Sequence, residues 1–268
     1  MPRRTRLDSE MVRRGLARSR EQAAELVAQG RVLVRGAVAS KPATAVQPAD
    51  PVLVARAGGN GDYVSRGGRK LAGALDVFGP SGPAIAGRRC LDAGASTGGF
   101  TDVLLRQGAA GVVAVDVGYG QLAWSLRTDP RVMVLDRTNA RDLIPELIGG
   151  RVDVVVADLS FISLTLVLPA LARCATGDAE LLLMVKPQFE VGRARLGRGG
   201  VVRDPALRIE AVTSVAAVAA RVGLGVGGVV ASPLPGPAGN VEYFLWLKAG
   251  APPVETLAVA RAVAEGPP

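Results

Sequence analysis

Leu91-Asp92-Ala93-Gly94-Ala95-Ser96-Thr97-Gly98-Gly99-Phe100 connects an apolar segment to a helical pattern in this chain of 268 residues. Its glycines let the backbone turn sharply and approach a ligand closely. A helix that begins near Gly99 would direct its first amide groups towards an anionic group. The spacing Asp92-x-Gly94-x-x-x-Gly98-Gly99 is looser than the G-x-G-x-x-G of pyrophosphate-binding loops. It favours a loop for S-adenosylmethionine over a dinucleotide-binding loop, and a turn needed only for packing is the third alternative.

Outside this loop, short apolar runs alternate with helical patterns through most of the chain. The runs expected to form strands are 89–91, 112–115, 132–135, 152–157, 181–185, 226–230 and 243–247. Such alternation is typical of an α/β fold in which helices cover both faces of a mostly parallel sheet. We therefore predict a Rossmann-like, doubly wound sheet of seven strands.

The N-terminal part has a different pattern. Residues 7–29 predict two short helices, the second capped by Ser19, and 32–34, 38 and 52–54 predict the strands of a small sheet. A glycine-rich segment follows, which is typical of a linker. The predicted organisation is an α+β domain over 1–58, a linker over 59–64 and the larger domain over 65–268.

Positive charge is concentrated in the N-terminal part. The whole chain has a formal net charge of +8, and residues 1–62 contribute 11 basic and 6 acidic side chains, a net of +5. Such an excess suits an RNA backbone, although a solvated basic face would look the same. A second basic segment lies at 192–200. The arginines that we predict to contact RNA are Arg3, Arg4, Arg6, Arg14, Arg18, Arg20, Arg66, Arg193, Arg195 and Arg198.

Several functional classes are disfavoured by composition. Two cysteines, Cys90 and Cys174, and no histidine argue against a disulfide-stapled fold and against a zinc site. We expect no bound metal. The basic N-terminus is not followed by an apolar signal region, and the uncharged stretch 222–241 contains six glycines and three prolines, so no membrane span is predicted. A cytoplasmic protein is expected.

Polar residues follow four of the predicted strands. Asp116, with Val117 beside it, follows the second strand, where a carboxylate can accept hydrogen bonds from ribose hydroxyls of NAD or of S-adenosylmethionine. Asn139 follows the third, Asp158 the fourth and Lys186 the fifth. Because the carboxyl ends of parallel strands meet at one edge of the sheet, these groups should line one crevice.

Five segments carry a more specific resemblance. Residues 91–101, Asp116-Val117-Gly118-Tyr119-Gly120-Gln121-Leu122, Ala157-Asp158-Leu159-Ser160-Phe161-Ile162-Ser163, Lys186-Pro187-Gln188-Phe189-Glu190 and Asn240-Val241-Glu242-Tyr243-Phe244 resemble the TlyA family. This resemblance spans nearly the whole chain. It implies a ribosomal RNA 2′-O-methyltransferase with an FtsJ-like catalytic domain and an N-terminal S-four-like RNA-binding domain.

The resemblance also implies site residues. The catalytic tetrad would be Lys70, Asp158, Lys186 and Glu242. The residues expected to bind S-adenosyl-L-methionine are Asp92, Gly94, Ser96, Thr97, Gly98, Gly99, Phe100, Asp116, Val117, Asn139 and Asp158. The expected substrate is a cytidine ribose in 16S and also 23S ribosomal RNA within ribosomal subunits, and the expected state is a monomer.

Methyl transfer to a ribose hydroxyl needs alignment and removal of a proton, for which a lysine can serve as the base. Free lysine has a pKa of about 10.4; burial or a second cation lowers it and carboxylates oppose this shift. Lys186 is the base that we expect. Two other functions remain alternatives: a membrane-active haemolysin, implied only by an old family label, and a ribosome-binding factor without catalytic activity.

Overall fold

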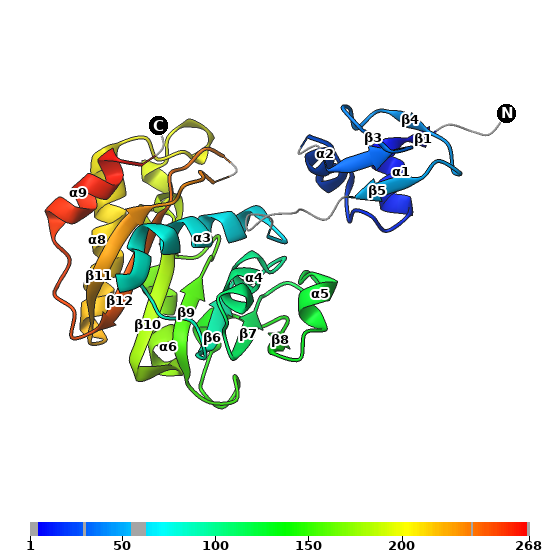
Figure 1. The fold of residues 1–268 in the computed structure, drawn as a ribbon. Helices are drawn as coiled ribbons and strands as arrows, with labels where there is room; N and C mark the ends of the chain where they lie inside the picture. The colour runs from blue at the N-terminus through cyan, green and yellow to red at the C-terminus, as the bar shows by residue number, and fades with distance from the viewer. Residues whose placement is uncertain (1–4, 29–30, 55–62, 237, 267–268) are drawn as a thin grey trace. The chain divides into compact units, whose positions relative to one another are not determined.

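The computed structural model describes residues 5–28, 31–54, 63–236 and 238–266. The chain divides into two compact units, Met1–Asp62 and Tyr63–Pro268 (Figure 1). Each unit has its own core and is described by itself.

The small unit packs two helices against short strands. Its elements are β1 (Thr5–Arg6), α1 (Leu7–Arg13), α2 (Arg20–Ala28), β2 (Val32–Val34), β3 (Ala37–Val38), β4 (Ala45–Val46) and β5 (Val52–Val54). The strands form an antiparallel sheet of order β3-β2-β5 and an antiparallel pair of β1 with β4. Leu7 and Met11 from α1 and Ala23 and Val27 from α2 are buried in its core. The regularly spaced apolar residues of both helices therefore form this core.

The large unit contains the predicted seven-stranded sheet. Its strands are β6 (Arg89–Ala93), β7 (Gly111–Val115), β8 (Val132–Leu135), β9 (Val152–Ala157), β10 (Ala175–Val185), β11 (Leu224–Ala231) and β12 (Tyr243–Ala249). Their order is β11-β12-β10-β9-β6-β7-β8; β6 to β10 run parallel, and β12 runs antiparallel to β10 and β11. The predicted fold class is confirmed.

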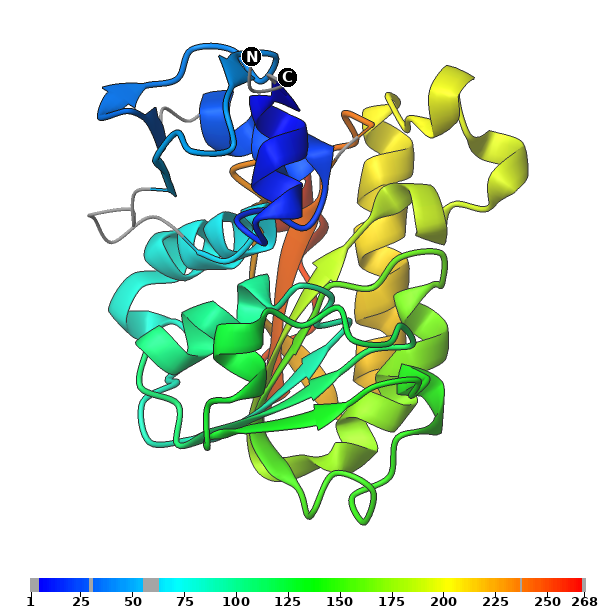
Figure 2. The ribbon, with the colours of Figure 1, turned by 90° about the vertical axis from the view of Figure 1, so that its right-hand side faces the viewer.

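Helices cover both faces of this sheet (Figure 2). One core contains residues of α3 (Arg66–Phe78), α4 (Gly99–Arg106) and α5 (Trp124–Arg127), and the other contains residues of α6 (Leu164–Cys174), α8 (Pro205–Arg221) and α9 (Thr256–Ala264). Successive strand residues point to opposite faces, so Val154 and Val156 enter the first core whereas Val155 and Ala157 enter the second. The apolar run of β9 is continuous because both of its faces are buried.

Short helical segments complete the unit: η1 (Gly79–Ser81), η2 (Ala140–Asp142), α7 (Pro187–Glu190), η3 (Arg193–Arg195) and η4 (Arg198–Gly200). Among the described helices, none is both long enough and apolar enough to cross a membrane.

Candidate active site

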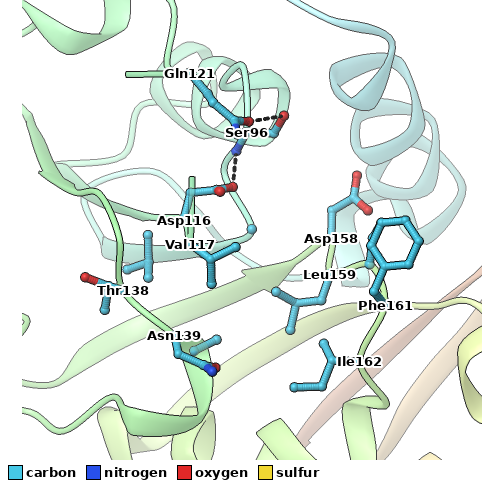
Figure 3. Close-up of a pocket in the computed structure, with 14 residues that line it drawn as sticks. Ser96, Asp116, Val117, Gln121, Thr138, Asn139, Asp158, Leu159, Phe161 and Ile162 are labelled. Atoms are coloured by element: carbon cyan, nitrogen blue, oxygen red, sulfur yellow. Dashed lines mark hydrogen bonds between the residues drawn. The ribbon is translucent and has the colours of Figure 1, made fainter. Parts of the chain in front are cut away.

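A cavity of about 530 Å³ lies at the carboxyl edge of the parallel strands, which is where open α/β sheets bind ligands (Figure 3). The loops after β6, β7, β8 and β9 form it. Fourteen residues line it: Gly94, Ser96, Val115, Asp116, Val117, Gln121, Thr138, Asn139, Ala140, Asp158, Leu159, Ser160, Phe161 and Ile162. Its volume is within the usual range for small-molecule sites.

The floor of this cavity requires glycine at position 94. Gly94 has φ +87°, and a Cβ atom there would lie 2.5 Å from the carbonyl oxygen of Asp158. The amide of Ser96 donates to Asp116 Oδ2 at 2.8 Å, and the amide of Gly118 donates to Oδ1 at 2.7 Å. These two bonds fix the Asp116 carboxylate at the cavity wall. Each carboxylate oxygen can accept a further hydrogen bond.

Six of the residues predicted to bind the cofactor line the cavity: Gly94, Ser96, Asp116, Val117, Asn139 and Asp158. The other five, Asp92, Thr97, Gly98, Gly99 and Phe100, are not among its lining residues. Phe100 is buried in a core, where its ring packs 5.9 Å from that of Phe244. The second half of the glycine-rich loop thus does not line the cavity, and Phe100 packs in the core. The sequence pattern alone did not distinguish such packing residues from ligand-binding residues.

Asp92 is fully buried beneath the loop. Thr101 Oγ1 donates to its Oδ2 at 2.7 Å, and Oδ1 has no hydrogen-bond partner in the part of the chain that the structure describes. Burial raises the pKa of Asp92 to about 7, against the opposing effect of the Thr101 hydrogen bond. Asp92 therefore contacts Thr101 in the interior and does not line the cavity.

Gly98 and Gly99 permit close packing. A Cβ atom on Gly98 would lie 2.8 Å from Leu122 Cδ1, and one on Gly99 would lie 2.7 Å from the amide nitrogen of Gly68 in α3. Only glycines allow the first turns of α3 and α4 to approach this closely. Because Lys70 lies two residues after Gly68 in α3, this contact helps to set the position of that lysine.

Lys70 and Glu242 form a buried ion pair. Lys70 Nζ lies 2.5 Å from Glu242 Oε2, and the exposed fractions of the two residues are 7% and 1%. Glu242 directly precedes β12 and lies beneath the turn after β11, where a Cβ atom on Gly236 would be 2.6 Å from Glu242 Oε1. Lys70 is therefore an interior residue with a carboxylate partner.

Lys186 and Asp158 form a second pair. Lys186 Nζ lies 2.6 Å from Asp158 Oδ1 and donates to Ser160 Oγ at 2.9 Å. Lys186 is 8% exposed although it directly follows a strand. Asp158 and Ser160 line the cavity, so Lys186 Nζ lies at its edge.

The two ion pairs lie at the same end of neighbouring strands. Val185 of β10 lies opposite Tyr243 of β12 at the end of their antiparallel ladder, so Lys186 and Glu242 each directly adjoin that end of the ladder. Gly67 of α3 would place a Cβ atom 3.8 Å from Asp158 Oδ2. All four residues of the predicted tetrad thus gather at one edge of the sheet.

Some lining residues were absent from the predicted set. Leu159, Ser160 and Ile162 lie within four residues after Asp158, and Thr138 directly precedes Asn139. Their positions after predicted strands could therefore have indicated them. Gln121 lines the cavity from the loop after β7, and no strand boundary marks it. Phe161 is 92% exposed at the rim, has φ +65° and contacts the ring of Phe189 at 5.2 Å.

The predicted RNA-contacting arginines have different environments. Arg6 and Arg20 are exposed and paired with Asp8. Arg193 and Arg198 are exposed, and Arg66 donates to the carbonyl oxygen of Pro235 at 3.5 Å. Arg18 is exposed and also interacts with another group of the protein. Arg3 and Arg4 lie outside the described residues.

Two of these arginines have internal structural contacts. Arg14 donates to Glu10 and to the carbonyl oxygens of Gln47, Pro48 and Asp50. Arg195 donates to Val191 O and makes a two-pronged pair with Glu210 at 2.6 and 2.7 Å. Arg14 is thus a staple within the small unit rather than an open surface cation, and Arg195 fastens its loop to α8.

Comparison with known proteins agrees with this architecture. The model of the FtsJ-like methyltransferase family matches residues 63–249, and the S4 domain model matches residues 5–52. The fold and the match together define the large unit as an FtsJ-like methyltransferase.

Similarity extends over the full chain to more specific relatives. The 16S/23S rRNA (cytidine-2′-O)-methyltransferase TlyA of Mycobacterium tuberculosis is 61% identical over 273 residues, covering 100% of both chains. Hemolysin A of Brachyspira hyodysenteriae is 36% identical and covers 89% of this chain and 98% of its own. A solved structure of a candidate hemolysin from Streptococcus thermophilus has a TM-score of 0.75 and 37% identity, with 99% and 96% coverage. The chain belongs to the TlyA family.

Proposed function

We propose that this chain transfers a methyl group from S-adenosyl-L-methionine to the ribose 2′-hydroxyl of a cytidine in 16S ribosomal RNA and in 23S ribosomal RNA. Full-length identity of 61% to an enzyme named for that reaction supports the substrate. The observation that carries the chemistry is the pair of lysine–carboxylate contacts at this edge of the sheet, one of which includes the cavity-lining residue Asp158.

The cavity suits the proposed cofactor. Asp116 would accept hydrogen bonds from the ribose hydroxyls, and Gly94 leaves room beside the Asp158 carbonyl where any side chain would intrude. Asn139 and Thr138 would lie along the adenine. Bound S-adenosylmethionine supplies an electrophilic methyl group on a sulfonium. The residues of the chain then have to orient the hydroxyl and take its proton.

Lys186 is the base in this proposal. Its Nζ lies at the cavity edge, and Asp158 and Ser160 hold it there at 2.6 and 2.9 Å. Lys186 Nζ would accept the proton of the ribose hydroxyl when that oxygen receives the methyl group. Positioned proton removal typically contributes about 10²–10⁴-fold in rate.

Lys70 and Glu242 complete the arrangement. The buried Glu242 carboxylate holds the Lys70 ammonium, and both Glu242 and Lys186 directly adjoin the same end of the β10–β12 ladder. In this proposal Lys70 orients the ribose hydroxyl, and Glu242 fixes Lys70.

The S4 domain and the loop 192–200 would hold the RNA. Exposed arginines on both supply phosphate contacts. A ribosomal substrate places the reaction in the cytoplasm. We propose that the enzyme acts as a monomer, which sedimentation of the purified protein tests.

Transfer of a labelled methyl group from S-adenosylmethionine to purified ribosomal subunits, followed by digestion to nucleosides, tests this function. The proposal expects labelled 2′-O-methylcytidine. Label on a base, or subunit binding without any transfer, would instead favour a different methyltransferase or a ribosome-binding factor.

A further inference from the structure

The small unit contains two carboxylates that are buried although they lie among arginines. Asp8 is 3% exposed and Glu10 is 2% exposed. Both lie in α1, and each pairs with two guanidinium groups. Because buried carboxylates are rare unless paired, these pairs are part of how the unit is built.

Asp8 connects the starts of the two helices. Arg6, from β1, donates to both of its oxygens, at 3.1 and 2.7 Å, and Arg20, the first residue of α2, donates to Oδ2 at 3.2 Å. The hydrogen bond from Arg6 holds the pKa of Asp8 well below its ordinary range, so the carboxylate is charged at neutral pH. A single buried anion thus fixes two cations that lie 14 positions apart in sequence.

Both arginines nevertheless remain open to solvent. The side chains of Arg6 and Arg20 are 51% and 60% exposed, whereas that of Arg14, the staple described above, is 20% exposed. A guanidinium has five N–H donors, and Asp8 uses only some of those of Arg6 and Arg20. Both arginines therefore keep N–H donors that Asp8 does not occupy, and such donors can bind phosphate oxygens while Asp8 restrains the side chains that carry them.

We infer that Asp8 is a positioning residue for RNA binding: it holds Arg6 and Arg20 as a preorganised clamp for one or two backbone phosphates. This inference rests on the proposed function of the small unit. The inference predicts an unusual effect of charge on RNA affinity. A negative charge near a phosphate normally weakens binding, yet here removing that charge should weaken binding, because two long side chains would then have to be ordered by the RNA itself.

The substitution D8N separates these effects. Asn can keep the oxygen that accepts from the Ser9 amide at 2.7 Å, and it loses the acceptor that Arg20 uses. We expect the full-length D8N protein to bind ribosomal subunits roughly tenfold more weakly, from the ordering of two arginine side chains. We also expect the slope of log affinity against log salt to fall. E25Q removes the same charge from an exposed position of α2 and should not weaken binding.

A charge-preserving variant covers the case in which D8N does not fold. R6K/R20K changes two surface side chains and keeps both charges, but lysine lacks the planar fork. It should lose affinity to a similar extent. Wild-type affinity and salt slope in R6K/R20K, or equal or tighter binding by a folded D8N, would overturn the inference.

A thermodynamic cycle distinguishes this inference from the proposed function. In the R6A/R20A background, D8N should cause no further loss of affinity, since the residues it positions are gone. If R6A/R20A itself binds subunits as the wild type does, the proposed role of this surface in RNA binding fails. If R6A/R20A binds weakly while D8N binds normally, only the positioning role of Asp8 fails.

Discussion

Lys70 Nζ lies 2.5 Å from Glu242 Oε2, although 172 residues separate the two in the sequence. The pair is buried, so each charge depends on the other for compensation. Glycine contacts at the start of α3 place the lysine, and the turn into β12 places the carboxylate. Two of the four predicted catalytic residues are thus brought together from opposite ends of the sequence of the large unit.

Removing one partner of this ion pair should destabilise the fold more than replacing both partners. K70M leaves an uncompensated buried carboxylate, which typically costs about 3–5 kcal/mol in the free energy of unfolding. Adding E242Q to K70M should restore much of that loss, while methyl transfer stays abolished. Urea unfolding of the single and double variants measures the coupling. Simple addition of the two single losses would show that the residues do not stabilise each other.

The contact between α3 and α4 should tolerate no side chain at Gly99. In G99A the new methyl group would meet the Gly68 amide nitrogen at 2.7 Å, and overpacking of this kind costs about 1–3 kcal/mol. We expect lower thermal stability and a lower rate, because α3 carries Lys70. G177A is the matched control, since no heavy atom of the described structure lies within 4 Å of the new methyl group. Equal stability of the two variants would contradict the packing role of Gly99.

Ser160 should affect the rate more than substrate binding. Its Oγ accepts a hydrogen bond from Lys186 Nζ at 2.9 Å and so positions the proposed base, and a hydrogen bond of this kind contributes about 0.5–1.5 kcal/mol. S160A should lower kcat by up to roughly tenfold and leave the KM for RNA nearly unchanged, and S160T should restore part of the rate. Steady-state kinetics with ribosomal subunits gives the comparison. A rise in KM at constant kcat would place Ser160 in substrate binding instead.

Asp92 should make stability depend on pH. Its pKa of about 7 in the folded chain exceeds the value of about 3.9 for free aspartate. Between these values the folded chain binds more protons than the unfolded chain, so its stability falls as the pH rises from about 4 to about 7. The loss is complete above pH 7 and amounts to about 4 kcal/mol.

D92N removes this titrating group and should therefore gain stability relative to the wild type as the pH rises through that window. Unfolding by urea between pH 4.5 and pH 8 gives the difference between the two proteins at each pH. A difference that stays constant with pH would show that Asp92 is ionised in the folded chain.

Much of the fold followed from local pattern. The alternation of apolar runs and helical segments predicted the seven-stranded sheet, and Ser19 Oγ accepts from the Gln22 amide at the start of α2, as its position suggested. Short elements such as β1 and β4 were not predicted, because two residues carry no periodicity. They exist through pairing with each other.

The candidate site was less accessible to local reasoning. Strand ends indicated Asp116, Asp158 and Lys186, whereas Lys70 and Glu242 came from a family resemblance, since nothing adjacent in sequence shows that α3 and the start of β12 meet. The glycine-rich loop was read as cofactor-binding throughout. Its first half lines the cavity, whereas Gly98, Gly99 and Phe100 pack against other elements, a division that depends on contacts with α3, Leu122 and Phe244.

The most direct test of the account compares wild-type protein with K186A in mapping 2′-O-methyl groups, nucleotide by nucleotide, on ribosomal RNA from cells that lack the endogenous enzyme. Wild-type protein should add the methyl group to cytidine riboses. K186A should add none while binding S-adenosylmethionine with near wild-type affinity. Methylation by K186A at the wild-type rate would contradict Lys186 as the base, and absence of any ribose methyl group added by the wild type would contradict the proposed reaction.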